Sequence, residues 1–412
     1  MKIELAYSKE KIEIEIPEKN IIEIVGSTPP RKKPEEKEII SHALTNPVAS
    51  PSLGDAVRGK KSATILVSDV TRPCPSYKFL PFILEELEKA KIKDIRIIFG
   101  LGSHRKHTEE EKRKLVGEGI LKKVQKLIDH DPEKCELIGY TKQGTPLEIY
   151  PEAKASDFLI TTGNIEYHYF AGYSGGAKAA IPGICSRRTI QKNHSLMLQE
   201  NATAGRFEDN PVRKDIEEAG KILGIDFIFN VILNDNKNII SAVAGKNNEA
   251  FVVGIKKYDE IFALRVKEKA DLVITSAGGY PKDINLYQAQ KALDNVKQIV
   301  KEGGEILLLA SCEEGFGEKT FESWMAYAHD FEWISSKISK EFTLGGHKAY
   351  AISKLLTRTK ISLYSKLSAK MVKKIGFKKI SNLQNYLDEK ISSNPRIKIT
   401  IVPSGRFVRF EG

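Results

Sequence analysis

The sequence predicts an α/β protein of two domains with mainly parallel sheets flanked by helices. Buried-strand patterns at residues 63–67 and 95–99 alternate with an amphipathic helical pattern at residues 77–90, which is typical of parallel strands joined by helices. The chain has 412 residues, more than a single hydrophobic core usually supports. We expect an N-terminal domain of residues 1–266 and a C-terminal domain of residues 267–412, with the active site in the cleft between them.

The N-terminal domain is expected to begin with a half-buried strand at residues 12–16, where isoleucine and glutamate alternate until Pro17. A Pro- and Lys-rich connection follows at residues 29–34. Thr108 and Glu111 form a capping-box pattern that predicts the start of a helix. Further elements are expected as a strand at 158–162, a helix at 211–223, apolar segments at 227–233 and 239–243, and a helix at 247–264.

The C-terminal domain is expected to begin after Lys267-Glu268-Lys269. A strand at residues 272–275 leads into the Gly278–Gly279 loop, and a second strand is expected at residues 305–310. Residues 280–291 are typical of a loop that enters a helix.

Composition excludes several classes of protein. The net charge is +11, but basic and acidic residues are interspersed and no aromatic–basic RNA-binding signature occurs, so we expect no nucleic-acid partner. No apolar run is long enough to cross a bilayer, and the start lacks the apolar core of a signal peptide, so we expect a cytoplasmic protein without a membrane partner. Four widely spaced cysteines predict free thiols rather than disulfides or a zinc ribbon.

Reactive side chains concentrate between Tyr167 and His194. The segment holds His168 and His194, and Lys178 follows the glycine pair Gly175–Gly176, where a backbone can approach a ligand closely. The alternative interpretation of each part is structural: a tight turn, a solvated lysine and partnered histidines.

Three further groups follow predicted strands. Asp69, His104 and the Gly278–Gly279 loop lie, like His168, just beyond carboxyl ends of strands, where open α/β sheets bind ligands. Arg72 lies in a proline-flanked loop and suits a carboxylate or phosphate, although a structural pair with Asp69 is an equal alternative.

Three histidines of the N-terminal domain and one helix face of the C-terminal domain each have a functional or a structural interpretation. His104 follows a glycine-rich turn and could be a metal ligand, a general base or a capping residue, whereas His107 and His130 are predicted to be structural. Gln288 and Lys291 are three residues apart, so a helix places both on one face, which is either a solvated surface or a site for an oxyacid.

Taken together, the motifs resemble the nickel-dependent lactate racemase family over most of the chain. They are Ser-Asp-x-Thr-Arg-Pro at 68–73, Gly-x-His-Arg at 102–105, His168 with Ala-Gly-Tyr-Ser-Gly-Gly-x-Lys at 171–178, Pro182-Gly183, Asn193-His194, Tyr-Gln-x-x-Lys at 287–291 and Gly-Gly-His-Lys-Ala-Tyr at 345–350. The set is specific, whereas each single motif is weak.

The resemblance implies a nickel pincer nucleotide, a pyridinium mononucleotide with sulfur donors and a nickel ion, attached covalently to Lys178. It implies that His194 ligates nickel and that His104 and His168 are the acid/base residues. The cofactor contacts it implies are Asp69, Val70, Thr71 and Arg72, and the substrate contacts are Arg72, Gln288 and Lys291. Cofactor-biosynthesis proteins are implied as partners, and Gly345–Lys348 is left with a structural role.

The chemistry of a 2-hydroxy acid agrees with this set of residues. Its α-hydrogen is barely acidic, so loss of hydride, with a base on the hydroxyl, is the easier route to a planar 2-keto acid. Racemisation then needs a hydride acceptor, one base for each orientation and cationic anchors, and two histidines with a pKa of roughly 6.5 suit the bases. The hydride chemistry belongs to the cofactor.

Three alternatives stay open. The same mechanism could act on a larger 2-hydroxy acid such as malate, 2-hydroxyglutarate, an aryl lactate or a sugar acid. Lys178 could instead form a Schiff base with a carbonyl cofactor, or the chain could be a non-catalytic carrier of the cofactor.

Overall fold

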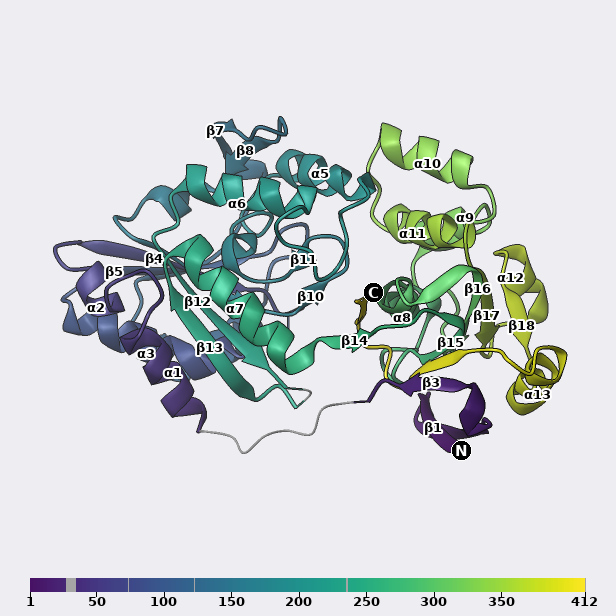
Figure 1. Cartoon of the computed structure of the whole chain (residues 1–412). Helices are drawn as coiled ribbons and strands as arrows, with labels where there is room; N and C mark the ends of the chain where they lie inside the picture. Colours follow the sequence, from purple (N-terminus) through teal and green to yellow (C-terminus); the bar gives the residue numbers. More distant parts are fainter. Residues whose placement is uncertain (27–34, 73, 122, 235, 412) are drawn as a thin grey trace. The chain divides into compact units, whose positions relative to one another are not determined.

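The computed structural model describes residues 1–26, 35–72, 74–121, 123–234 and 236–411, which form two compact units (Figure 1). The large unit is Pro29–Phe262, and the small unit combines Met1–Thr28 with Ala263–Gly412. The connection expected at residues 29–34 lies outside the described residues.

The predicted domain boundary needs a correction, because the start of the chain belongs to the small unit. Strand β3 (Ile21–Ile24) pairs in parallel with β19 (Ile399–Val402). The antiparallel hairpin of β1 (Lys2–Tyr7) and β2 (Glu10–Glu15) shares a hydrophobic core with strands of the small unit. The alternating pattern predicted β2, but an amphipathic strand does not reveal which sheet it will cover.

The large unit contains a six-stranded sheet of order β13-β12-β9-β4-β5-β6. Every neighbouring pair is parallel except β12 and β13. The strands are β4 (Ser62–Ser68), β5 (Asp94–Gly100), β6 (Lys126–Asp129), β9 (Leu159–Asn164), β12 (Phe227–Leu233) and β13 (Ile239–Gly245). The predicted α/β class is therefore confirmed, and the parallel strands place their carboxyl ends at one edge.

Helices cover both faces of this sheet (Figure 1). The face with α1 (Glu36–Thr45), α2 (Leu53–Ala56) and α3 (Ser76–Lys89) forms the larger core, which includes Phe79 and Phe229. The opposite face carries α6 (Pro211–Leu223) and α7 (Asn247–Phe262). Helix α4 (Glu109–Val116) begins at the predicted capping box of Thr108 and Glu111.

Short elements occupy the chain between β6 and α6. They are the hairpin of β7 (Glu136–Tyr140) and β8 (Pro146–Ile149), the ladder of β10 (Tyr167–His168) and β11 (Gly172–Tyr173), the 3₁₀ turn η5 (Gly176–Ala179) and helix α5 (Arg187–Ser195). The predicted reactive segment therefore folds as a short ladder, a 3₁₀ turn and helix α5 of the large unit.

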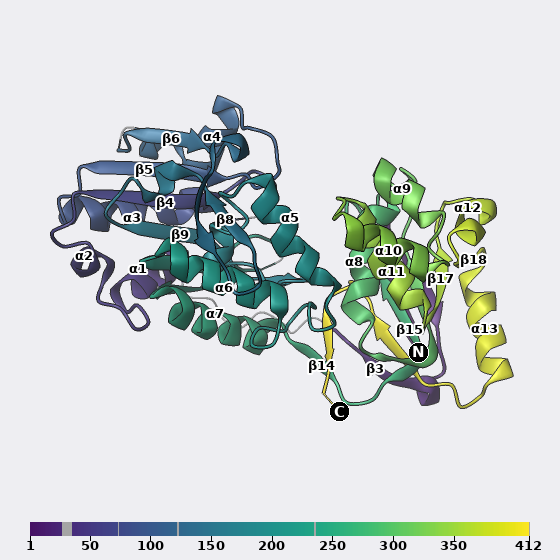
Figure 2. The same cartoon turned by 90° about the horizontal axis from the view of Figure 1, so that it is seen from above.

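The small unit contains a parallel sheet of order β18-β17-β16-β15-β19-β3. Besides β1, β2, β3 and β19, the strands of this unit are β14 (Leu264–Val266), β15 (Ala270–Ser276), β16 (Val300–Leu309), β17 (Lys360–Tyr364), β18 (Lys378–Ile380) and β20 (Val408–Phe410). Its helices are α8 (Leu286–Val296), α9 (Lys319–Met325), α10 (Phe331–Lys340), α11 (Gly346–Leu356), α12 (Ala369–Lys374) and α13 (Leu383–Ser393). Figure 2 shows α8 and α11 on one side of this sheet and α13 on the other.

Among the described residues, no helix combines the length and the apolar character that crossing a membrane requires.

Candidate active site

The turn that carries Lys178 depends on its two glycines. Gly175 and Gly176 have φ angles of 90° and 60°, which side chains rarely adopt. A Cβ atom on Gly176 would lie 2.8 Å from Arg213 Nη2 and 2.9 Å from the Phe251 ring. The Gly176 amide also donates a 2.8 Å hydrogen bond to the buried side-chain oxygen of Asn230. The glycine pair is thus required by packing as well as by conformation.

Lys178 lies in a cationic and partly buried environment. Burial, followed by the positive charges of Arg72 and Arg213, lowers the pKa of its amine to about 7, although Glu166 and Asp69 oppose this shift. A substantial fraction of the amine is therefore neutral near pH 7, which makes it a nucleophile.

Asp69 and His104 form a hydrogen-bonded pair across two adjacent strand ends. Asp69 follows β4, its side chain is 3% exposed, and its carboxylate contacts Nδ1 of His104 and accepts a 2.7 Å hydrogen bond from Thr71. Burial raises the pKa of Asp69, but the hydrogen bonds from His104 and Thr71 and the charges of His104 and Arg72 outweigh it, so the net pKa is lowered. The ionised carboxylate fixes a proton on Nδ1 of His104 and leaves Nε2 as the basic atom.

His168 is held in the opposite tautomer. Its Nδ1 atom accepts a 3.2 Å hydrogen bond from the Ala171 amide, so the proton of the neutral ring is on Nε2. Burial, with the charges of Lys178, Arg72, His194 and Arg213, lowers the pKa of His168 well below its ordinary value. The ring is therefore neutral at physiological pH.

His194 lies on α5, close to His168. Its ring packs edge-on against Phe170 at 4.9 Å between centroids, and Phe170 packs against His168 at 4.6 Å. The preceding residue, Asn193, is fully buried and donates a 2.8 Å hydrogen bond to Asp215 of α6, which anchors this helix.

The charges of these groups shift one another's pKa values, as expected of side chains that share one region of the large unit. The charges of Arg72 and His194 lower the pKa of His168, and the charge of Asp69 raises the pKa of Lys178. The contact partners of the Asp69 carboxylate are His104 and Thr71, rather than the guanidinium of Arg72. The alternative of a purely structural Asp69–Arg72 pair is therefore not supported.

Gln288 and Lys291 lie on α8 of the small unit. The Lys291 amine donates a 3.1 Å hydrogen bond to the Gln288 side chain, which confirms that the two share a helix face. Lys348, on α11, is buried and donates to the carbonyl of Tyr287 at 2.6 Å. The Gly345–Lys348 segment thus supports the start of α8.

The histidines predicted to be structural have structural contacts. His130 is fully buried, and burial lowers its pKa to about 4. His107 donates from Nδ1 to Asp129 at 2.7 Å and accepts from the Val70 amide at 3.1 Å, so it also holds the loop after β4. The four cysteines are free thiols, as predicted.

Sequence reasoning missed Arg213 and Asn230. Both are fully buried and contact the Lys178 turn. The one available signal was the i, i+4 spacing of Arg213 and Glu217, which is common on solvated helices and did not indicate burial.

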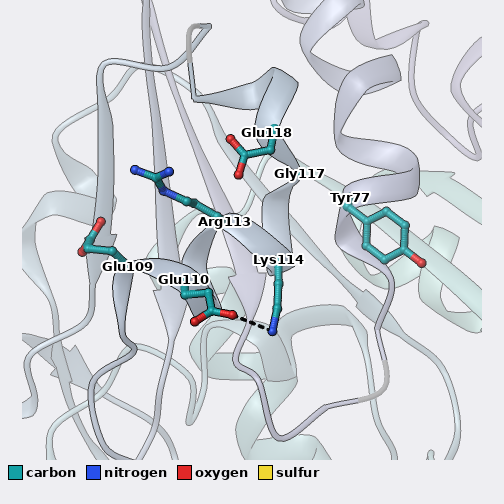
Figure 3. Close-up of a pocket in the computed structure, with 7 residues that line it drawn as sticks. All are labelled: Tyr77, Glu109, Glu110, Arg113, Lys114, Gly117 and Glu118. Atoms are coloured by element: carbon teal, nitrogen blue, oxygen red, sulfur yellow. Dashed lines mark ion pairs between the residues drawn. The ribbon is translucent and has the colours of Figure 1, made fainter.

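A separate surface pocket of about 560 Å³ lies between α3 and α4 (Figure 3). Its lining includes Tyr77 and the ion pair of Glu110 with Lys114. It contains none of the residues predicted for the site, and we assign it no role in the chemistry.

No cluster of three or more histidine, cysteine, aspartate or glutamate side chains suited to a metal occurs in the part of the chain that the structure describes.

Two family models match the chain, the lactate racemase N-terminal domain over residues 7–205 and the lactate racemase C-terminal domain over residues 266–408. The lactate racemase of Thermoanaerobacterium thermosaccharolyticum is 37% identical over 344 residues, 82% of this chain and 80% of that protein. The lactate racemase of Lactiplantibacillus plantarum is 34% identical over 335 residues, 80% of this chain and 79% of that protein.

Two solved structures are also similar to this chain. The lactate racemase apoprotein of Thermoanaerobacterium thermosaccharolyticum has a TM-score of 0.90 and 33% identity, with 100% of both chains covered. A protein from Thermotoga maritima has a TM-score of 0.62 and 16% identity, covering 92% of this chain and 100% of that one, which is a likeness of fold alone.

Proposed function

Because the chain belongs to the lactate racemase family, and is therefore an isomerase that acts on a hydroxy acid, we propose that it interconverts the two enantiomers of lactate. The observation that supports this most directly is the pair of differently held imidazoles, His104 and His168, together with the Lys178 amine, whose charge lowers the pKa of His168. Larger 2-hydroxy acids are the alternative substrates.

We propose that the large unit binds a nickel pincer nucleotide. Lys178 has an amine that is partly neutral near pH 7 and can form the covalent bond to the cofactor, through a thioamide. His194 supplies one imidazole ligand for nickel, and the absence of a protein ligand cluster among the described residues suits a metal whose remaining donors belong to the cofactor. The loop from Asp69 to Arg72 contacts the cofactor, with His107 holding its Val70 amide.

When bound, this cofactor would supply the hydride acceptor and donor that the reaction requires. His104 accepts the hydroxyl proton of one enantiomer at Nε2, because Asp69 fixes the other ring proton on Nδ1. The buried carboxylate of Asp69 also stabilises the imidazolium that forms.

His168 is the acid/base residue for the other enantiomer of the substrate. In its present tautomer it presents Nε2–H, which donates a hydrogen bond to the substrate oxygen on that side. To act as the base for the other enantiomer, the ring exchanges its proton to Nδ1 and releases the Ala171 amide. Its lowered pKa keeps it neutral, and hence competent as a base, well below pH 6.5.

The substrate carboxylate requires cationic anchors. The exposed Arg72 supplies a planar fork of donors, and Gln288 and Lys291 supply an amide and an amine on one face of α8. We assign all three to substrate binding.

A Schiff-base mechanism is the second candidate, because an amine with a pKa of about 7 also suits attack on a carbonyl. Borohydride reduction distinguishes the two, since it traps an imine on Lys178 as a stable secondary amine.

The test of function uses chain produced together with the cofactor-biosynthesis proteins that we propose as partners. Single enantiomers of lactate, malate, 2-hydroxyglutarate, an aryl lactate and a sugar acid are incubated with it, and optical activity is followed. We expect lactate to racemise fastest. His104→Ala and His168→Ala should each abolish turnover without loss of cofactor, whereas a carrier protein would show no turnover in the wild type.

A further inference from the structure

Arg213 is a fully buried arginine whose contacts converge on the Lys178 turn. It lies in the first turn of α6, where its amide donates to the capping side chain of Asn210 at 3.0 Å, and its side chain is 0% exposed. Arginine is almost never fully buried unless its charge is paired. The partners of Arg213 therefore indicate why it is there.

The guanidinium has a compensating charge on one side. Glu217, one helical turn away, forms a 2.7 Å ion pair with Nη2, and the Phe251 ring lies 3.9 Å from the guanidinium carbon. A buried ion pair of this kind adds little stability compared with apolar side chains of the same volume. Stability alone is therefore a weak reason for an arginine at this position.

On the other side, the guanidinium spans the turn before Lys178. Nη1 donates to the carbonyl of Tyr173 at 3.1 Å and Nη2 donates to the carbonyl of Gly175 at 3.0 Å. The Gly175 carbonyl also accepts the backbone amide of Lys178 at 3.3 Å. A single carbonyl thus joins the guanidinium to the residue that carries the amine.

The space around the turn is matched to this arginine. The absence of a side chain at Gly176 makes room for Nη2 and for the Phe251 ring, both of which a Cβ atom would meet at less than 3.0 Å. Asn230 fixes the Gly176 amide from the neighbouring strand β12. The turn is therefore held by donors to its carbonyls and by an acceptor for its amide.

The same helix also supports the segment that carries His194. Asp215 of α6 is fully buried and accepts hydrogen bonds from Asn193 at 2.8 Å and from Thr145 at 2.9 Å. Arg213 and Asp215 point to different segments, so α6 acts as a common support for the Lys178 turn and for α5.

From this geometry we infer that Arg213 is a positioning residue: its two-pronged contact with the Tyr173 and Gly175 carbonyls aims Lys178 for attachment of the cofactor. This inference rests on the proposed function for the attachment step, but the holding of the turn is a property of the chain itself. A lysine keeps the charge opposite Glu217 but lacks the planar fork that reaches both carbonyls.

Two variants and one control test the inference. Arg213→Lys keeps the charge, and the double variant Arg213→Met with Glu217→Met removes both charges without leaving a buried carboxylate unpaired. The matched control is Arg96→Lys in β5, because Arg96 is also largely buried, pairs with Asp94 and donates to the Ala155 carbonyl at 3.2 Å.

The first readout is amide hydrogen exchange of the cofactor-free full chain, measured by mass spectrometry below its unfolding temperature. We expect exchange in peptides that cover residues 173–179 to be at least about tenfold faster in both Arg213 variants, and unchanged in the Arg96 control. If one Arg213 variant does not fold, the other decides the result. Unchanged exchange in the turn overturns the inference.

The second readout is the fraction of chains that carry a mass increment on the Lys178 peptide after production with the cofactor machinery. We expect this fraction to fall in the Arg213 variants at a fixed production time, since a displacement of about 1 Å can slow a reaction about 100-fold. Faster exchange with wild-type loading overturns the positioning role. If the wild type itself carries no increment on Lys178, the proposed function fails, and the holding of the turn is judged by exchange alone.

Discussion

Replacing Asp69 with asparagine removes the carboxylate that orients His104 and leaves the size of the side chain unchanged. Asp69 is 3% exposed and accepts hydrogen bonds from His104 and from Thr71. An asparagine amide that keeps its oxygen on Thr71 turns its N–H donors toward Nδ1 of His104. That ring then carries its proton on Nε2 and loses the basic atom that we propose faces the substrate.

The size of the effect follows from how firmly the ring is held. The same substitution in the buried Asp–His pair of a serine protease lowers kcat by about 10⁴-fold. His104 is more accessible, with 43% of its side chain exposed, so water can partly replace the missing acceptor. We expect kcat to fall by about 100-fold to 1,000-fold.

The assay measures lactate racemisation from each enantiomer and divides the rate by the amount of cofactor-loaded chain, because Asp69 is also assigned to cofactor binding. Asp131→Asn is the control, since Asp131 caps a 3₁₀ turn and pairs with the exposed Lys106. A kcat for Asp69→Asn within twofold of the wild type, per loaded chain, would refute the role of the Asp69–His104 pair.

Three other perturbations have defined outcomes. Gly176→Ala should lower the free energy of unfolding by about 1–3 kcal/mol more than Gly144→Ala, because both glycines have positive φ but only Gly176 has atoms within contact distance of an added Cβ. Equal losses of unfolding free energy in a denaturant titration would contradict this difference in packing. The rate of acetylation of Lys178 in cofactor-free chain should rise with pH and reach half its maximum near pH 7, where the amine loses its proton. The rate for Lys114, whose pKa the ion pair with Glu110 raises, should still be rising at about pH 10, and coincident pH profiles of the two lysines would rule out the lowered pKa of Lys178. Burial lowers the pKa of His130 from 6.5 to about 4, so the unfolded chain takes up the proton first and stability falls as the pH drops through this interval. His130→Gln should remove about 3 kcal/mol of that fall, and an unaltered pH dependence of the free energy of unfolding would contradict the assignment.

Local patterns were sufficient for much of the fold. The apolar runs that became β4, β5, β9 and β12 are buried on both faces, and such runs between helical patterns are typical of parallel strands. Because parallel strands end at one edge, the positions of Asp69 and His104 after β4 and β5 implied that they would meet, and they form a hydrogen bond.

Other features depend on contacts that no local pattern contains. The N-terminal hairpin packs with β15, more than 250 residues away in sequence, and its amphipathic strands would suit any apolar sheet face. Arg213 is one charged residue on an amphipathic helix, and its burial becomes visible only when the Lys178 turn folds over it. The tautomers of His104 and His168 likewise depend on Asp69 and on the Ala171 amide in the folded chain.

We propose that Lys178 carries the cofactor covalently and that His194 ligates its nickel ion. The most direct measurement is peptide mapping by mass spectrometry combined with nickel analysis, on chain produced with the cofactor machinery. We predict one mass increment, on the peptide that contains Lys178, with about one nickel ion per loaded chain; His194→Ala should keep the increment and lose nickel, and Lys178→Ala should lose both. Racemisation by chain that has no increment on Lys178 would contradict the account.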